Sequence, residues 1–186
     1  MQTHILEGGF ADHPQEASRS FRAVMTAMAR PGTIHAVAGA QPPAPLSPAA
    51  GTVLLTLCDP ETPVFLAAGL DQPQVRDWIT FHTGAPFGAA QDAMFAVGAW
   101  DQLPLAEFPQ GTAEYPDRSA TLIVELPTLS NSGATLQGPG IKDRTQVSLP
   151  ETRAFQDNAR LFPLGLDFIF TSGDCLAAVP RTTRVS

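Results

Sequence analysis

Hydrophobic side chains follow a helical period near the start of the chain. Between residues 12 and 32 the apolar positions lie three or four residues apart, at Ala17, Phe21, Val24, Met25 and Met28. This spacing predicts an amphipathic helix whose apolar stripe, Met25 and Met28 included, packs in the core. Asp12 is the expected N-cap, with Gln15 at the capping-box position, and Arg30-Pro31-Gly32 ends the helix.

Beyond this helix the apolar runs are short and alternate between strand and helix patterns. Strands are predicted at residues 33–37, 64–67, 94–100, 120–126 and 136–137, and helices at 48–57, 73–82 and 151–161, with a short helical piece at 101–108. Ser47 and Asp71 are the expected N-caps of the helices at 48–57 and 73–82. The alternation predicts a three-layer αβα fold with a mixed sheet, in one α/β domain that spans residues 1–186.

Near the end of the chain, two apolar runs at residues 166–171 and 175–179 predict an antiparallel β-hairpin around Ser172-Gly173-Asp174. Asp167 lies inside the first run, and Pro180-Arg181-Thr182-Thr183-Arg184 follows the second. A carboxylate in a buried strand is costly unless it is paired, so we expect one of these two arginines to bind Asp167. The other arginine, with Thr182 and Thr183, would form an anion clamp; a solvated basic tail is the alternative.

The charge balance narrows the classes of function. The formal net charge of −7 argues against nucleic acid and anionic membranes as partners. No apolar run reaches membrane-spanning length and the N-terminus lacks a signal-peptide pattern, so the cytoplasm is the expected location. Lys142 is the one lysine in the sequence. Anion recognition must therefore rest on arginine, and a cofactor held as a Schiff base would have a single candidate residue in a polar loop.

Several isolated side chains leave alternatives open. Arg19, Arg22 and Arg30 fall on one side of the first helix, where a solvated face and a partner or anion surface fit equally well. His82 lies at the C-terminal end of a predicted helix, where the helix dipole would favour its protonated form; it is either structural or in contact with a ligand. Cys58 and Cys175 are expected to be core thiols, and no Cys or His spacing predicts a metal site.

The motifs of common enzymes do not occur in the sequence. It contains no Gly-x-Ser-x-Gly elbow, no nucleotide P-loop and no acidic pair in a glycosidase-like context. Gly138-Pro139-Gly140 follows a predicted strand, where glycines can expose amides to phosphate, but no strand–loop–helix motif surrounds it. Residue chemistry therefore leads to a soluble α/β domain with clustered arginines and a potential anion site, and names no reaction.

Seven short segments, taken together, resemble one family. They are residues 20–32 (SFRAVMTAMARPG), 53–66 (VLLTLCDPETPVFL), 81–86 (FHTGAP), 111–126 (GTAEYPDRSATLIVEL), 138–141 (GPGI), 162–174 (FPLGLDFIFTSGD) and 178–185 (AVPRTTRV). In this order and spacing the chain resembles the PhnH family, the H subunit of the bacterial carbon–phosphorus lyase system. FPLGLD followed by PRTT is the most specific part of the resemblance.

The resemblance implies a fold similar to the large domain of pyridoxal-phosphate-dependent (PLP) transferases, without the cofactor and its lysine; the loop position of Lys142 fits that loss. It implies a homodimer that joins the G, I and J subunits in a multisubunit core. It also implies that this subunit is required, with the G, I and L subunits, to form ribose 1-methylphosphonate 5-triphosphate from ATP and methylphosphonate. In such a transferase and lyase system, the isolated chain is expected to have no activity of its own.

We hypothesise that five residues in the matching segments border a cleft at a dimer or subunit interface: Arg22, His82, Asp167, Arg181 and Thr182. In this hypothesis Arg181 and Arg22 bind phosphate or phosphonate oxygens of an ATP-derived or phosphonate anion, and Asp167 orients one of them. Arg19 and Arg30 belong to a partner-facing side of the first helix. The alternatives are a purely structural docking subunit without a ligand site, and an independent transferase descended from the PLP fold.

Overall fold

A six-stranded mixed sheet lies at the centre of the computed structural model, which describes residues 7–186. Residues 1–6, part of the N-terminal stretch considered for a signal peptide, lie outside the described residues. The strand order is β1-β8-β7-β4-β3-β2, and four neighbours run parallel: β2 (Val64–Leu66), β3 (Phe95–Ala99), β4 (Thr121–Glu125) and β7 (Asp167–Ser172). β8 (Cys175–Val179) and β1 (His35–Ala36) are antiparallel, which confirms the predicted C-terminal hairpin as β7–β8.

A second, three-stranded antiparallel sheet was not predicted as such. Its central strand β5 (Ala134–Gln137) lies between β6 (Thr145–Val147) and β9 (Arg184–Val185). Beyond β9, the backbones of Ser186 and Thr135 exchange two hydrogen bonds of 2.8 and 2.9 Å. The tail that follows β8 therefore leaves the large sheet and becomes the edge of the small one.

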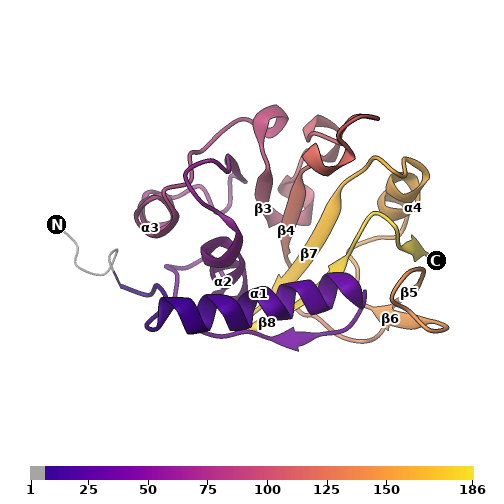
Figure 1. The fold of residues 1–186 in the computed structure, drawn as a ribbon, viewed down its shortest axis with the longest axis horizontal. Helices are drawn as coiled ribbons and strands as arrows, with labels where there is room; N and C mark the ends of the chain where they lie inside the picture. Colours follow the sequence, from indigo (N-terminus) through magenta and orange to yellow (C-terminus); the bar gives the residue numbers. More distant parts are fainter. Residues whose placement is uncertain (1–6) are drawn as a thin grey trace.

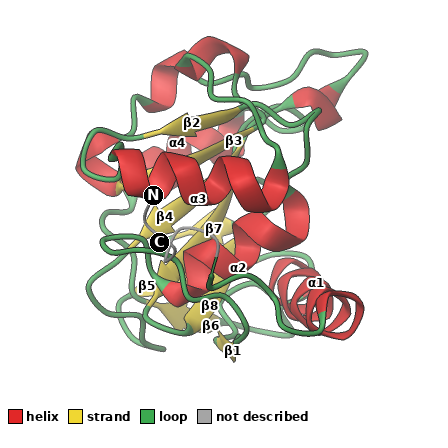
Figure 2. Ribbon diagram, turned by 90° about the vertical axis from the view of Figure 1, so that its left-hand side faces the viewer, coloured by secondary structure: helices red, strands yellow, loops and turns green. Residues whose placement is uncertain are grey.

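Helices cover one face of the large sheet, and a mixed layer covers the other. α1 (His13–Ala29), α2 (Pro48–Leu57) and α3 (Pro73–Thr83) pack on the first face, and α4 (Arg153–Arg160) packs with the small sheet on the second (Figures 1 and 2). Ile123 and Ile169 point to the first face, whereas Leu122 and Phe168 point to the second, as strand alternation requires. The predicted mixed α/β arrangement is confirmed, but a sheet shares the second outer layer with a helix.

α1 starts at the predicted N-cap, but its buried face differs from the predicted stripe. The Asp12 carboxylate accepts a hydrogen bond from the Gln15 N–H, and the Glu16 carboxylate, rather than the Gln15 side chain, accepts one from the Asp12 N–H. Ser20, Val24 and Ala27 are buried, while Phe21 and Met25 are half exposed. The prediction that Met25 packs in the core is wrong, because α1 turns its small side chains toward α2 and β8.

The other helices agree with the sequence in position and differ in detail. The Ser47 hydroxyl caps α2 as predicted, by accepting a bond from the Ala50 N–H. Gln72 rather than Asp71 is the N-cap of α3, because the Asp71 carboxylate instead binds the Arg76 guanidinium. Residues 101–108 lie across two 3₁₀ turns, Trp100–Gln102 and Leu105–Glu107, because Pro104 cannot continue a helix. Two further turns, Ala90–Asp92 and Pro116–Arg118, were not predicted. No helix formed by the described residues is long and apolar enough to cross a membrane.

The two cysteines differ in burial, and this difference predicts their reactivity. Burial raises the pKa of the Cys58 thiol to about 12, whereas Cys175 is only half buried and the pKa of its thiol is raised by a smaller desolvation. At neutral pH the thiolate fraction of Cys58 should be about a thousandfold below that of a free thiol. In the native protein, a chromogenic disulfide reagent should modify one thiol, Cys175, well before the other. Equal rates, read by peptide mapping and compared with Cys175→Ser, would contradict this.

Candidate functional site at the C-terminal tail

An ion pair between Asp167 and Arg181 fixes the tail to the start of β7. The Arg181 guanidinium contacts both Asp167 oxygens, at 2.5 Å for the closest pair, and the Arg181 N–H donates to the same carboxylate at 2.8 Å. The remaining guanidinium N–H groups donate to the carbonyls of Pro116 and Pro163 and to the Ser119 hydroxyl. The side chains of Asp167 and Arg181 are only 16% and 13% exposed.

The expectation that a tail arginine pairs with Asp167 is therefore confirmed. A guanidinium carries five N–H donors, and those of Arg181 are all directed to atoms of this chain. No donor is left for a ligand oxygen in this conformation. The geometry thus gives Arg181 a positioning role, in which it holds three segments together: the start of β7, the loop before β4 and the tail.

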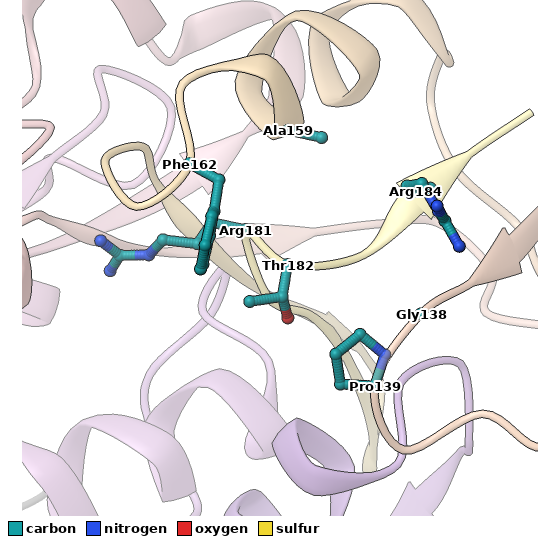
Figure 3. A pocket seen from close by; sticks show the side chains of 7 residues that line it. All are labelled: Gly138, Pro139, Ala159, Phe162, Arg181, Thr182 and Arg184. Atoms are coloured by element: carbon teal, nitrogen blue, oxygen red, sulfur yellow. The ribbon is translucent and has the colours of Figure 1, made fainter.

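A pocket of about 380 Å³ opens beside this ion pair. It is lined by Gly138, Pro139, Ala159, Phe162, Arg181, Thr182 and Arg184, and we call it the tail pocket. Figure 3 shows that the Arg181 and Arg184 side chains point in opposite directions. A second hollow of about 330 Å³ adjoins the tail pocket, because Ala159 and Arg184 line both; its other residues are Gln156, Arg160 and Val185.

The tail pocket combines one cationic side chain with an apolar wall. The Arg184 guanidinium is exposed and has no hydrogen bond or ion pair with the described part of the chain, and the Thr182 hydroxyl adds a donor. Phe162 is exposed, and with Pro139 and Ala159 it supplies apolar surface. Such a lining can accept a small anion that carries an organic group. Sequence reasoning anticipated a free tail arginine but did not select Arg184, because the turn at residues 180–183 decides which arginine faces Asp167.

The glycines of the 138–141 segment allow two other backbones to come close. A Cβ on Gly140 would lie 1.9 Å from the Ala29 carbonyl oxygen at the end of α1, and one on Gly138 would lie 3.0 Å from the Thr182 carbonyl oxygen. This loop therefore lies between α1 and the tail. Close packing against these backbones explains why glycine occupies both positions. A phosphate site formed by their amides is not needed to explain them.

Arg22 and His82 lie away from the tail pocket. Arg22 is exposed on α1 and His82 lies on α3, and both helices cover the opposite face of the large sheet. The tail pocket is lined by Arg181 and Thr182 but by neither of these two residues. Within one chain, then, only Asp167, Arg181 and Thr182 of the five hypothesised residues come together; Arg19 and Arg30 are exposed with Arg22 on α1.

His82 takes part in anchoring the segment before α1. Its Nε2 lies 3.3 Å from the Glu7 carbonyl oxygen, which also accepts a bond from the Trp78 indole at 3.1 Å. The Trp78 and Phe81 rings flank the imidazole, with centroids 5.0 and 4.9 Å away. Burial lowers the pKa of His82 despite this backbone hydrogen bond. This direction is opposite to the expected effect of the helix dipole, and its largest cause is desolvation of the imidazole by burial.

This lowered pKa predicts a pH dependence of stability. Between the lowered folded pKa and the ordinary value of 6.5, the unfolded chain binds a proton at His82 that the folded chain does not. Stability should therefore fall as the pH is lowered from 7 through 6.5 toward that folded value. In urea unfolding at several pH values, His82→Gln should show a shallower loss than the wild type, and His35→Gln should serve as the control for a histidine elsewhere. Identical slopes in all three would contradict the prediction.

The sequence also predicts that the protein holds neither PLP nor a structural metal ion. Lys142 is exposed in the turn between β5 and β6. Among residues 7–186, no group of three or more His, Cys, Asp or Glu side chains has the arrangement of a metal site. The absence of PLP and of a metal remains a prediction.

Fold and site together define an α/β protein whose arginines are placed either to join its own segments or to face outward at a pocket and along a helix. The chain belongs to the PhnH family: residues 8–186 match this family, which is described as bacterial phosphonate metabolism protein.

Two relatives match over nearly their whole length. The alpha-D-ribose 1-methylphosphonate 5-triphosphate synthase subunit PhnH of Rhizobium meliloti (strain 1021) is 41% identical over 198 residues, covering 99% of this chain and 97% of the relative. The putative C-P lyase subunit protein HtxG of Stutzerimonas stutzeri is 29% identical over 196 residues, covering 97% of this chain and 96% of the relative.

Proposed function

We propose that this chain is the H-type accessory subunit of a carbon–phosphorus lyase system for organic phosphonate catabolism. In this role it is required, with G, I and L subunits, for forming ribose 1-methylphosphonate 5-triphosphate from ATP and methylphosphonate. The observation that carries the proposal is the 41% identity, over almost the full length of both chains, with a PhnH subunit of that synthase. The proposal includes a homodimer and docking to G, I and J subunits.

The arrangement of polar groups supports an accessory role. The most extensive side-chain network in the tail, around Arg181, serves to join segments of the chain. The exposed arginines Arg22 and Arg184 lie on different layers, which suits contacts with separate partners or ligands. We therefore expect the isolated chain to bind ligands or partner subunits without turning over a substrate.

A genetic experiment tests this function directly. A bacterium that lacks its own H subunit gene but keeps the G, I, J and L genes should not grow on methylphosphonate as the sole phosphorus source. Expression of this chain should restore growth, and the tagged chain should co-purify with G, I and J subunits. Growth on inorganic phosphate serves as the control. Failure of a folded, well-expressed chain to restore growth, or substrate turnover by the chain alone, would contradict the proposal.

We further propose that the tail pocket holds the phosphonate or phosphate oxygens of a ligand through Arg184 and Thr182, with Asp167 and Arg181 as the support. Each charge-assisted hydrogen bond contributes about 1.5–3 kcal/mol, so Arg184→Ala should weaken binding of methylphosphonate at least about tenfold. A ³¹P NMR titration would measure this. Arg153→Ala is the matched control, because Arg153 is an exposed arginine on the nearby helix α4.

A purely structural subunit is the alternative function, and one observation favours it: all guanidinium donors of Arg181 are satisfied within the chain. In that case methylphosphonate should bind the wild type and Arg184→Ala equally weakly, while growth and assembly are unaffected by the substitution. An independent PLP-type transferase has less support, since Lys142 is exposed in a turn.

A further inference from the structure

The solvent side of α1 carries two large apolar side chains where a surface helix would usually carry polar ones. Phe21 is 49% exposed and Met25 is 54% exposed. They are four residues apart, so they lie on the same side of the helix, one turn from each other. The buried side of α1 is already occupied by α2 and β8. Phe21 and Met25 therefore form an apolar row that no other element of residues 7–186 covers.

Arg22 borders this apolar row, and Arg19 and Arg30 lie further round α1. From Ala17 to Arg30 the chain has no acidic residue, and Arg19, Arg22 and Arg30 are all exposed. None of the three forms an ion pair with the described residues, and the guanidiniums of Arg22 and Arg30 have no hydrogen bond there either. In a protein with 18 acidic and 11 basic residues, such unpaired cations next to apolar side chains favour an acidic, partly apolar partner. We call the surface of Arg19, Phe21, Arg22 and Met25 the α1 outer face.

A hollow of about 250 Å³ lies on the other side of α1, at the edge of the large sheet. It lies between α1 and the segment of β1, and is lined by Glu16, Arg19, Ser20, Ala23 and residues 36–38. Small side chains such as Ser20 and Ala23 leave room there for one side chain of a partner. Because the hollow faces away from Phe21 and Met25, a helix packed on the apolar row would not fill it.

The same charges argue against a second copy of this chain as the occupant. A twofold dimer through the α1 outer face would bring Arg19 and Arg22 of one copy close to the same residues of the other. Like charges at an interface centre are unfavourable when they lose water. The homodimer of the proposed function is therefore expected to use a different surface.

We infer that the α1 outer face docks an amphipathic helix of another subunit, with apolar residues at i and i+4 flanked by aspartate or glutamate. Two antiparallel or parallel helices would then bury Phe21 and Met25 between them, and Arg19 and Arg22 would pair with the flanking carboxylates. This inference rests on the proposed function, because it needs a multisubunit assembly to supply the partner.

The test measures binding of the purified full chain to an immobilised complex of the remaining G, I and J subunits. Met25→Asp and Arg22→Glu should each raise the dissociation constant at least about tenfold. Met94→Asp and Arg153→Glu are matched controls, because Met94 is 48% exposed outside α1 and Arg153 lies on α4; they should change it less than about twofold. Higher salt should weaken the wild type more than Arg22→Glu.

Each other outcome overturns the inference in a recognisable way. Unchanged binding of both α1 variants would place the interface elsewhere. If Met25→Asp abolishes binding while Arg22→Glu and higher salt leave it unchanged, the partner is not acidic. If sedimentation shows that the isolated chain is a dimer and that Met25→Asp dissociates this dimer, the occupant of the α1 outer face is a second copy. If the wild type binds anionic vesicles and Arg22→Glu abolishes this binding, the occupant is a membrane. If the wild type does not bind the G, I and J complex at all, the proposed function itself fails.

Discussion

Replacing Arg181 by alanine should lower the free energy of unfolding by about 3–5 kcal/mol, because it leaves the largely buried Asp167 carboxylate without its cationic partner and with only the backbone N–H of residue 181. The substitution also removes the donors to the Pro116 and Pro163 carbonyls and to the Ser119 hydroxyl. The loop before β4 and the turn before β7 would lose their shared anchor. Urea denaturation followed by circular dichroism would measure the loss.

Two further variants separate the buried charge from the general loss of an arginine. Arg184→Ala removes an exposed guanidinium from the same tail and should change stability by less than about 0.5 kcal/mol. The double variant Asp167→Asn, Arg181→Ala should be less destabilised than the sum of its single variants, because the two side chains interact directly. Equal losses for Arg181→Ala and Arg184→Ala would show that the ion pair contributes little.

Gly140→Ala should be destabilising by about 2–4 kcal/mol, from left-handed backbone strain together with overpacking. Gly140 has φ of +81°, and its added methyl carbon would lie 1.9 Å from the Ala29 carbonyl oxygen and 3.2 Å from the Pro31 ring. Backbone atoms cannot give way as a flexible side chain can, so the 138–141 loop would have to move away from α1. Thermal unfolding of the purified variant would measure the cost.

Gly173→Ala is the control for the backbone term alone. Gly173 also has a left-handed backbone, with φ of +59°, but no atom lies within 4 Å of its would-be Cβ. The free energy of unfolding of this variant should be only about 1 kcal/mol lower than that of the wild type. A loss for Gly140→Ala no larger than that for Gly173→Ala would show that the contact with α1 is not tight.

The sequence predicted elements whose signals are local. The β7–β8 hairpin follows from two apolar runs around a glycine turn, and the N-caps Asp12 and Ser47 lie where their side chains indicate. The pairing of Asp167 with a tail arginine follows from the cost of an unpaired buried carboxylate. These features depend on a few neighbouring residues, or on one strong energetic requirement.

Features set by long-range packing could not be predicted in this way. β9 has two residues and forms only because β5, far away in the sequence, offers a partner edge. The helical stripe that included Phe21 and Met25 fits the spacing of a buried face as well as the observed Ser20–Val24–Ala27 side does. Tertiary contacts with α2 and β8 decide between the two, and no local pattern carries that information.

The position of the tail also has a consequence during synthesis. β5 and the loop before β4 are translated well before Arg181 and β9 emerge from the ribosome, yet both depend on them for pairing. On a nascent chain that reaches only to β8, the apolar side of β5, including Leu136, would have no β9 beside it, and such an intermediate would be exposed to proteases and chaperones. A chain truncated after β8 should therefore be digested by proteases faster than the full chain.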